Sequence, residues 1–266
     1  MAKIKTGDLV LFFYNDSKKW LLKISKKEQF HSHIGVIKHA DAIGKEFGSR
    51  LVTNKDKYVY LLKPTIHDHV MKMQHGTQIV YPKDLGYIAA RTGLQSGQKV
   101  VEIGTGSGSL TTFLASIVKP RGHVYTFDVE PKFMEIAEKN IKKAGMIKYV
   151  TMHNQNLKKS KKLPVDECDL AIIDLGDPWE VLPQVRKMLK SSGSVVAICP
   201  TMNQLEKLSA AFVEHEFTDI ESTEHILRRI EARDGKTRHS YQGIGHTTYL
   251  AMARKVYFNK KRSKKK

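Results

Sequence analysis

Residues 100–110 constrain the fold of this chain more than any other segment. Their sequence, VVEIGTGSGSL, passes from apolar β-branched residues to a carboxylate, then to three alternating glycines and the start of an apolar helical pattern. This order predicts a strand, a tight turn over Gly104, Gly106 and Gly108, and a helix. Because glycine has no Cβ, the backbone of such a turn can approach a ligand closely.

The spacing of the glycines narrows the choice of ligand. A dinucleotide-binding turn would place its third glycine at the position of Ser109, and a phosphate-binding P-loop would add a lysine that is absent here. The turn therefore favours a nucleoside without a pyrophosphate, for which S-adenosylmethionine is the obvious candidate. We predict that Glu102, Gly104, Gly106 and Gly108 take part in binding it.

The basic composition points to a polyanionic partner. The chain has 266 residues, with 45 Lys and Arg against 27 Asp and Glu and a net charge of +18. That excess favours nucleic acid over an anionic membrane surface. Cys168 and Cys199 stand alone in apolar runs and are expected to be reduced core thiols, with an intersubunit disulfide as the alternative. With no signal-peptide pattern and no apolar run of bilayer length, we expect a cytoplasmic protein that does not bind membranes.

The pattern of secondary structure changes at Pro64. Residues 1–64 hold short strands separated by turn residues, which predicts a small N-terminal β-domain. After a linking segment, strands and amphipathic helices alternate, which predicts a parallel sheet with helices on both faces; residues 218–224 and 247–255 are expected to add an antiparallel pair. The predicted fold class is α/β. This sheet and its linking segment occupy residues 65–258, and residues 259–266 form a basic tail.

In an open parallel sheet, the residues that directly follow the strands line the ligand site. Asp128 follows the second strand of the sheet, where a carboxylate can accept both hydroxyls of a ribose; its alternative role is to cap the helix beginning near Pro131. Asn156 follows the third strand, where its amide would bond the adenine edge of the cofactor. Asp174 emerges from the buried run LAII, and we expect it to carry the chemistry because a carboxylate there needs a partner.

Several motifs together resemble one enzyme family over nearly the whole chain. They are GDLVL at residues 7–11, GTQIVYPKD at 76–84, the glycine turn at 102–110, DLGDPW at 174–179, GHT at 245–247 and ARK at 253–255. This set resembles the tRNA (adenine-58-N1)-methyltransferases of the archaeal and bacterial single-subunit type. The resemblance implies that residues 65–258 form a Rossmann-like S-adenosylmethionine-dependent methyltransferase sheet.

The resemblance implies transfer of a methyl group from S-adenosylmethionine to N1 of adenine 58 in the T-loop of tRNA; whether adenine 57 is also modified stays open. It implies that Asp174 lies between cofactor and adenine and that Tyr81 lines the adenine pocket, so these two are the predicted catalytic residues. The cofactor contacts that it implies are Gln78, Ser107, Gly108, Ser109, Leu110, Asp128, Asn156 and Asp174. It also implies a homotetramer.

Arg238 and the tail residues Lys260, Lys261 and Arg262 are the predicted RNA contacts, although a tail of this composition is equally typical of a disordered solubilising end. The histidine pairs at positions 31 and 33 and at 67 and 69 have no third ligand nearby in sequence, so no metal site is predicted.

Two other functions stay open at this point. The chain would suit a methyltransferase that acts on another RNA or on a small molecule, because the fold hosts many chemistries. It would also suit a non-catalytic RNA-binding subunit of a larger methyltransferase. The presence of the glycine turn, Asp128 and Asp174 argues against the second alternative.

Overall fold

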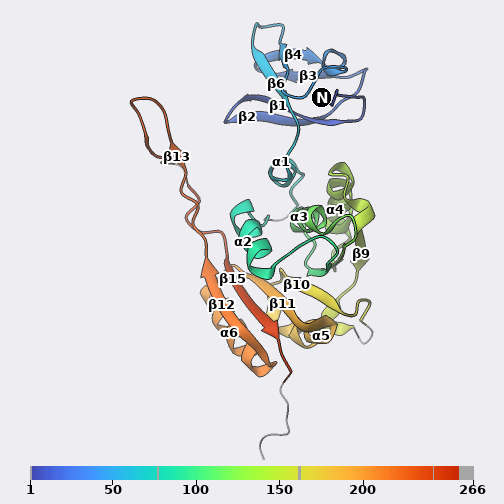
Figure 1. The fold of residues 1–266 in the computed structure, drawn as a ribbon, viewed down its shortest axis with the longest axis vertical. Coiled ribbons are helices and arrows are strands. Elements are labelled where there is room, and N and C mark those ends of the chain that lie inside the picture. Colours follow the sequence, from blue (N-terminus) through green and yellow to red (C-terminus); the bar gives the residue numbers. More distant parts are fainter. Residues whose placement is uncertain (1, 77, 161–162, 242, 258–266) are drawn as a thin grey trace, which may run out of the picture. The chain divides into compact units, whose positions relative to one another are not determined.

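The structure, a computed structural model, describes residues 2–76, 78–160, 163–241 and 243–257. The chain forms two compact units, Met1–Met73 and Gln74–Lys266 (Figure 1). The predicted tail contacts Lys260, Lys261 and Arg262 lie outside the described residues. No helix within the described ranges has the length and apolar character needed to cross a membrane.

The first unit is built on a four-stranded antiparallel sheet in the order β2-β1-β6-β5. Its strands are β1 (Leu9–Asn15), β2 (Lys18–Lys23), β5 (Arg50–Val52) and β6 (Tyr58–Leu62), and a separate hairpin pairs β3 (Gln29–Ser32) with β4 (Gly35–Lys38). Alternate residues, among them Phe12, Val59 and Leu61, point into one buried core. The predicted N-terminal β-domain is confirmed, with β3 and β5 as additional strands.

Helix α1 (Ile66–Lys72) belongs to the same unit and packs on β2. It begins with a capping box in which Thr65 Oγ1 accepts the backbone N–H of Asp68 and the Asp68 carboxylate accepts that of Thr65. The unit therefore extends to Met73, whereas the sequence pattern alone places the boundary at Pro64.

The second unit contains a seven-stranded sheet in the order β12-β15-β11-β10-β7-β8-β9. Its strands are β7 (Lys99–Ile103), β8 (His123–Asp128), β9 (Val150–Asn154), β10 (Cys168–Ile173), β11 (Leu189–Cys199), β12 (Phe217–Glu224) and β15 (Tyr249–Lys255). The strands from β11 to β9 are parallel, and β15 runs antiparallel to both β11 and β12. This is the predicted sheet, including its antiparallel C-terminal pair.

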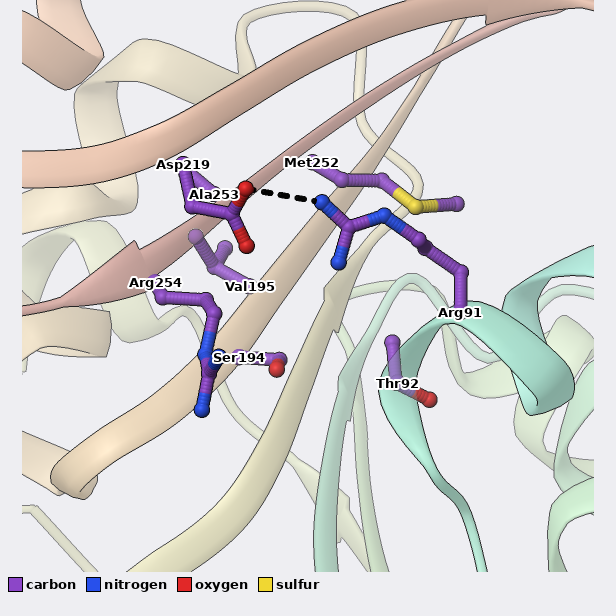
Figure 2. Close-up of a pocket in the computed structure, with 8 residues that line it drawn as sticks. All are labelled: Arg91, Thr92, Ser194, Val195, Asp219, Met252, Ala253 and Arg254. Carbon is purple, nitrogen blue, oxygen red and sulfur yellow. Dashed lines mark ion pairs between the residues drawn. The ribbon is translucent and has the colours of Figure 1, made fainter.

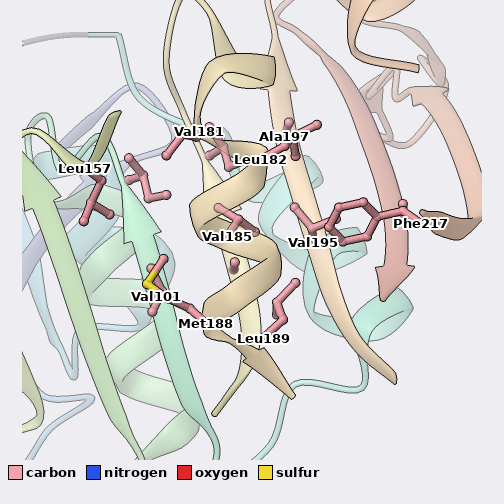
Figure 3. Close-up of a cluster of buried hydrophobic side chains, with 14 of the residues drawn as sticks. Val101, Leu157, Val181, Leu182, Val185, Met188, Leu189, Val195, Ala197 and Phe217 are labelled. Carbon is pink, nitrogen blue, oxygen red and sulfur yellow. The ribbon is translucent and has the colours of Figure 1, made fainter. Parts of the chain in front are cut away.

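Helices cover both faces of this sheet. They are α2 (Pro82–Thr92), α3 (Ser109–Val118), α4 (Pro131–Lys143), α5 (Leu182–Met188) and α6 (Met202–Glu214). Val101 and Ile103 of β7 share a core with α5 and α6, part of which Figure 3 shows. The residue between them, Glu102, faces α3, because its carboxylate accepts a hydrogen bond from Thr111.

The sequence pattern did not predict α2, because residues 65–87 were expected to form a linking segment whose one short helical pattern covered residues 67–73. The helix begins with Tyr81 at the N-cap and Pro82 in its first turn, where the missing N–H of proline has no intrahelical partner to lose. It ends at Gly93, which adopts the left-handed conformation.

The core between the sheet and α6 yields the first prediction. Phe212 is fully buried and packs edge-on against Phe217, with the ring centroids 5.6 Å apart. Phe212→Ala should lower the free energy of unfolding by about 3–5 kcal/mol, because it removes buried apolar surface and leaves a cavity. The neighbouring residue Val213 is 68% exposed, so Val213→Ala is the matched control in urea denaturation. Equal losses in the two variants would contradict this packing.

Candidate functional site

The glycine turn lies directly against the end of β10. Gly104 has a φ of +103°, and a Cβ at this position would overlap the backbone carbonyl oxygen of Asp174. The Asp174 N–H in turn donates to the carbonyl of Ile103 over 2.8 Å. Only glycine fits at position 104. Because it has no side chain, the turn can lie directly against Asp174.

Asp128, at the end of β8, faces the same turn. Its Oδ2 accepts the N–H of Gly106 over 3.0 Å, and its Oδ1 accepts the N–H of Glu130 over 3.0 Å. The N-cap of α4 is Glu130 rather than Asp128, so the helix-capping alternative is wrong. The two backbone bonds fix the direction of the carboxylate, and each oxygen keeps a lone pair for a ligand hydroxyl.

The last part of the turn anchors the segment that leads to α2. Gly108 has a φ of +75°, and a Cβ there would lie 3.1 Å from the Cα of Ala137, so its absence allows α3 and α4 to pack closely. Ser107 Oγ accepts the N–H of Gly76 over 3.1 Å, and Asn140 Nδ2 donates to the Ser107 carbonyl over 2.9 Å. These bonds hold the start of residues 76–84 beside the turn.

The structure places the remaining predicted cofactor contacts as follows. Ser109 and Leu110 are buried at the start of α3, and within the described residues Ser109 Oγ has no hydrogen-bond partner. Asn156 is exposed, and its Oδ1 caps a short 3-10 helix by accepting the N–H of Lys158 over 3.0 Å. A bond from Asn156 to an adenine edge stays a prediction.

Glu102, in β7, is buried on the side of the sheet that carries α3. It is fully buried, and its Oε2 accepts the hydroxyl of Thr111 over 2.5 Å. Its other oxygen, Oε1, has no hydrogen-bond partner in the described part of the chain. Burial raises the pKa of Glu102 to about 8, against the hydrogen bond from Thr111, which lowers it. At neutral pH this side chain is therefore mostly a neutral acid, and the cofactor contact predicted for it stays a prediction.

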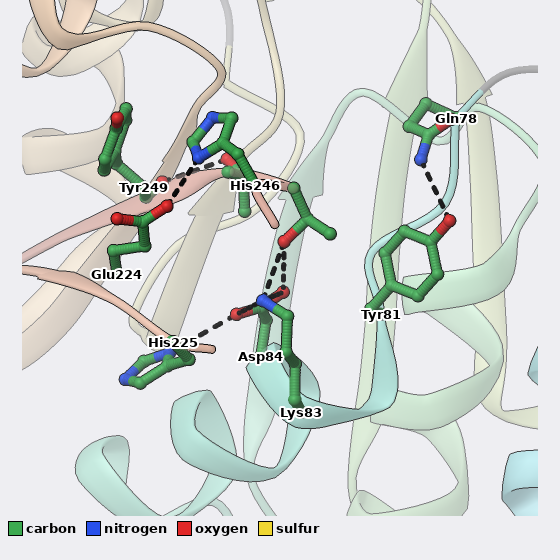
Figure 4. Close-up of polar contacts among 10 residues, drawn as sticks. Gln78, Tyr81, Lys83, Asp84, Glu224, His225, His246 and Tyr249 are labelled. Carbon is green, nitrogen blue, oxygen red and sulfur yellow. Dashed lines mark hydrogen bonds and ion pairs between the residues drawn. The ribbon is translucent and has the colours of Figure 1, made fainter. Parts of the chain in front are cut away.

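A pocket brings together Gln78, Tyr81 and Asp174, three of the residues that the resemblance assigns to adenine and cofactor. It is lined by Gln78, Ile79, Val80, Tyr81, Asp84, Asp174, Ile198, Pro200, Thr247 and Thr248. Gln78 Nε2 donates to the Tyr81 hydroxyl over 3.4 Å, which Figure 4 shows. Asp174 is half-buried in this pocket, 96 residues along the chain from Gln78.

Asp174 is electrostatically unusual. Burial raises its pKa to about 6, and the negative charge of Asp128 adds to that shift. Unfolded, the same side chain would titrate near 3.8. A carboxylate that is held this close to neutrality by its surroundings gains from any positive charge that enters the pocket.

One wall of the pocket is fixed by a buried ion pair that sequence reasoning missed. The Asp84 side chain is 1% exposed, and Lys83 Nζ lies 2.9 and 2.8 Å from its two oxygens. The same Nζ donates to Thr247 Oγ1 over 2.7 Å, and His225 Nδ1 lies 3.3 Å from Asp84 Oδ1 (Figure 4). The contacts tie the first turn of α2 to residues 225 and 247. The sequence signal that could have revealed the start of this helix was Pro82, because proline is favoured in the first turn of a helix.

His246 makes a second polar link on the same segment. Its Nδ1 lies 2.6 Å from Glu224 Oε1, and its Nε2 lies 3.0 Å from the carbonyl oxygen of Pro200, which lines the pocket. The hydrogen bonds to Glu224 and to Pro200 raise the pKa of His246. His246 therefore acts as a structural link between the end of β12 and the pocket wall at Pro200.

The far end of α2 is held by further polar contacts. Glu221 accepts hydrogen bonds from Tyr87 and from Arg91, and Arg91 also pairs with Asp219 over 3.1 Å. The Arg91–Asp219 pair borders a small hollow over β11, β12 and β15, shown in Figure 2. Together with the Asp84 contacts, these bonds attach the whole length of α2 to the C-terminal strands.

Arg238 lies outside this pocket. It belongs to the short hairpin of β13 (Ile230–Glu231) and β14 (Arg238–His239), pairs with Glu231 over 2.8 Å and stacks over Tyr241 at 4.2 Å from the ring centroid. Cys168 and Cys199 are both buried and free. The described ranges contain no cluster of three or more His, Cys, Asp or Glu arranged to hold a metal ion.

The site fits S-adenosylmethionine on structural grounds. The glycine turn offers a backbone cradle that side chains would fill, Asp128 offers a fixed carboxylate for ribose hydroxyls, and the raised pKa of Asp174 suits a cationic neighbour. Asp128, Asp174 and the turn backbone would hold the cofactor.

Solved structures place the fold in a known class. A SAM-dependent O-methyltransferase from Thermotoga maritima matches with a TM-score of 0.90 at 30% identity and covers 96% of both chains. The tRNA (m1A58) methyltransferase TrmI from Aquifex aeolicus matches with a TM-score of 0.84 at 31% identity, over 97% of this chain and 100% of its own. The chain therefore has the Rossmann-like fold of the SAM-dependent methyltransferases, whose methyl donor is S-adenosylmethionine.

Sequence comparison gives the family. The family model described as "tRNA methyltransferase complex GCD14 subunit" matches residues 57–266. A Methanocaldococcus jannaschii protein named tRNA (adenine(57)-N(1)/adenine(58)-N(1))-methyltransferase TrmI is 33% identical over 89% of this chain and 91% of its own length. The Thermus thermophilus tRNA (adenine(58)-N(1))-methyltransferase TrmI is 29% identical over 85% and 88%. The chain belongs to this GCD14 family, as the motifs predicted.

The buried acid Glu102 should make stability pH-dependent. Its pKa is about 8 when folded and near 4.5 when unfolded, so protonation favours the folded state. The resulting stability is complete below pH 4.5 and is lost as the pH rises towards 8, at up to about 1.4 kcal/mol per pH unit. Glu102→Gln should remove this dependence. Urea denaturation from pH 5 to 8 measures it, with the exposed Glu138→Gln as control. An unchanged slope in Glu102→Gln would contradict the assignment.

Removal of only one partner of the Lys83–Asp84 ion pair should strongly lower the stability of the fold. Lys83→Met leaves the Asp84 carboxylate buried without its cation, so the free energy of unfolding should fall by about 3–5 kcal/mol. The double variant Lys83→Met with Asp84→Asn removes both charges and should recover part of that loss. Lys142→Met, which breaks the exposed Lys142–Glu138 pair, is the control and should change stability by less than about 1 kcal/mol. Additive losses in the double variant would show that the two charges do not interact.

Proposed function

We propose that this protein transfers a methyl group from S-adenosylmethionine to N1 of adenine 58 in tRNA. The observation that carries the proposal is the pocket in which Asp174, Tyr81 and Gln78 meet beside the glycine turn. The names of the M. jannaschii, T. thermophilus and A. aeolicus relatives support the substrate, and the first of these names adenine 57 as well. Modification of adenine 57 is included in the proposal as a second product to be measured.

The chemistry requires positioning more than proton removal. Adenine N1 carries an in-plane lone pair, so no proton has to leave before it attacks the methyl carbon. The cofactor supplies that methyl group on a positively charged sulfur. The methylated base becomes positively charged, so the protein accelerates the step by aligning the two reactants and placing negative charge near the base.

Asp174 suits that role. Its carboxylate can accept hydrogen bonds from the amino group of adenine, which fixes the base with N1 directed at the donor. Guanine would present a carbonyl oxygen at the same place, and the two acceptors would repel each other. The pKa near 6 leaves Asp174 ionised at neutral pH, and the developing charge on the base then faces a carboxylate in a poorly solvated pocket.

Tyr81 and Gln78 form the opposite side of the pocket. Tyr81 is the N-cap residue of α2, so the helix fixes its backbone, and its hydroxyl accepts a hydrogen bond from Gln78. The ring can stack on the target base or bond its edge. An adenine whose N1 is paired in folded RNA must first leave its stack, at a cost of a few kcal/mol that phosphate contacts across a basic protein can offset.

We also propose that the protein is a homotetramer that acts in the cytoplasm. Support for self-association comes from residues 225–241 and 243–245, which leave the sheet after β12 as a long hairpin (Figure 1). This hairpin exposes large apolar side chains: Ile226, Leu227, Ile230, Tyr241 and Ile244. A two-stranded hairpin is marginally stable by itself, so such a surface gains from a covering partner. The buried reduced thiols Cys168 and Cys199 suit the cytoplasm.

The direct test is methylation of an unmodified tRNA transcript with labelled S-adenosylmethionine, followed by nucleoside analysis and mapping of the modified position. We expect 1-methyladenosine at position 58, and none there when adenine 58 is replaced by guanine. If the labelled methyl group appears in a small molecule or in another class of RNA, that molecule is the substrate and tRNA is not. Binding of tRNA without any methyl transfer would instead indicate a non-catalytic subunit.

The pH profile tests the role of Asp174. Its raised pKa means that the carboxylate becomes protonated as the pH falls through about 6, so kcat/KM for tRNA should fall on the acid side with an apparent pKa near 6. Asp174→Asn should lower kcat about 10²–10³-fold and abolish this acid limb, with a much smaller change in cofactor affinity. The exposed neighbour Asp177 provides the control, Asp177→Asn. If Asp174→Asn loses cofactor affinity as strongly as turnover, Asp174 is a cofactor-binding residue instead.

A further inference from the structure

The outer face of β5 and β6 in the N-terminal unit carries exposed aromatic side chains. Tyr58 and Tyr60 are 49% and 43% exposed, and Val52 is 53% exposed. The strand register places Val52 opposite Tyr58 and Arg50 opposite Tyr60, so all four side chains lie on one face of the sheet. We call these four residues the aromatic face.

Arg50 crosses this face diagonally. Its guanidinium carbon lies 4.4 Å from the centroid of the Tyr58 ring, within cation–π distance, although the strand register pairs it with Tyr60. The arrangement presents two rings and one planar cation side by side to solvent. Each of these groups has a flat surface on which another flat ring can stack.

The aromatic face is not a misplaced part of the hydrophobic core. The residues that alternate with it, Leu51, Val59 and Leu61, are buried in the core on the opposite face of the same sheet. That core is therefore complete without the tyrosines. Large apolar side chains that cluster on the surface, outside a completed core, mark an interaction site.

The charge around the face indicates a polyanion. The unit Met1–Met73 contains 14 Lys and Arg against 7 Asp and Glu. Lys55 and Lys57 lie in the turn that joins β5 to β6, directly before Tyr58. A partner that offers both flat rings and negative charge is an unpaired stretch of RNA, because bases stack on aromatic side chains of a sheet while lysines and arginines contact the phosphates.

We propose that the aromatic face binds unpaired nucleotides of the RNA substrate, with one base stacked on Tyr58, one on Tyr60, and Arg50 alongside them. This inference rests on the proposed function for its choice of RNA. It assigns to the N-terminal unit a binding surface of its own, whose role is to hold the RNA and not to take part in methyl transfer.

The experiment compares flat with non-flat replacements in the full-length protein. The double variant Tyr58→Leu with Tyr60→Leu keeps apolar bulk and removes both stacking surfaces; Tyr58→Phe with Tyr60→Phe keeps both. For a tRNA transcript, we expect Kd to rise about tenfold for each ring lost in the leucine variant and to stay within about twofold of wild type in the phenylalanine variant. In methylation assays KM for tRNA should rise in parallel, with kcat and the Kd for S-adenosylmethionine unchanged.

Two further measurements make the source of the effect clear. Stacking is not an ionic contact, so the slope of log Kd against log salt should stay the same in the leucine variant. In Arg50→Ala that slope should become smaller by about one, which corresponds to the loss of one phosphate contact. Tyr149→Leu, at another tyrosine with a cation over its ring (Lys148 Nζ at 5.0 Å), is the matched control and should bind tRNA as wild type does.

The outcomes separate this inference from the proposed function. If the wild-type protein methylates tRNA and the leucine variant binds tRNA equally well, the aromatic face does not bind RNA. A leucine variant with a reduced number of subunits in light scattering would show that the face is a contact between copies of the chain, which also overturns the inference. If the wild-type protein neither binds nor methylates tRNA, the proposed function itself fails.

Discussion

The site depends on one close approach, in which the backbone of Gly104 lies against the carbonyl of Asp174. Any Cβ at position 104 would overlap that oxygen, so a larger residue would push the ends of β7 and β10 apart. The two neighbouring glycines have related duties: Gly106 donates to Asp128, and the absence of a side chain at Gly108 lets α3 and α4 pack together. The turn that leaves room for a ligand therefore also sets the positions of the Asp128 and Asp174 carboxylates.

The electrostatics follow from that turn. Asp174, Asp128 and Glu102 end or flank adjacent strands of one parallel sheet, so three acids share a small volume. Burial raises the pKa of Glu102 and keeps it mostly protonated, with smaller contributions from the charges of Asp174 and Asp128, whereas Asp174 retains a charge that burial and Asp128 disfavour. A cationic donor and a base that becomes cationic would both be attracted to the Asp174 charge, so the burial that raises the pKa of Asp174 also favours these ligands.

Local patterns in the sequence predicted most of this site, because the turn, Asp128 and Asp174 each follow a strand that its own residues define. Contacts between distant segments were not predictable in that way. The Lys83–Asp84 pair attaches α2 to the pocket wall through Thr247, which lies 164 residues after Lys83. Helix α2 was missed because its first residues resemble a linker. Strict alternation along β7 could have warned that Glu102, between the core residues Val101 and Ile103, points away from them.

The position of β15 has a consequence for biosynthesis. This strand lies between β11 and β12 in the sheet, although it follows both in the chain. During translation the strand edges of β11 and β12 that pair with β15 stay without that partner until β15 emerges from the ribosome and inserts between them. Thr247 and Thr248, which complete the pocket, arrive with that strand. A nascent chain therefore cannot complete the pocket around Asp174 before β15 is made, and chains truncated before β15 would lack the wall that Thr247 and Thr248 form.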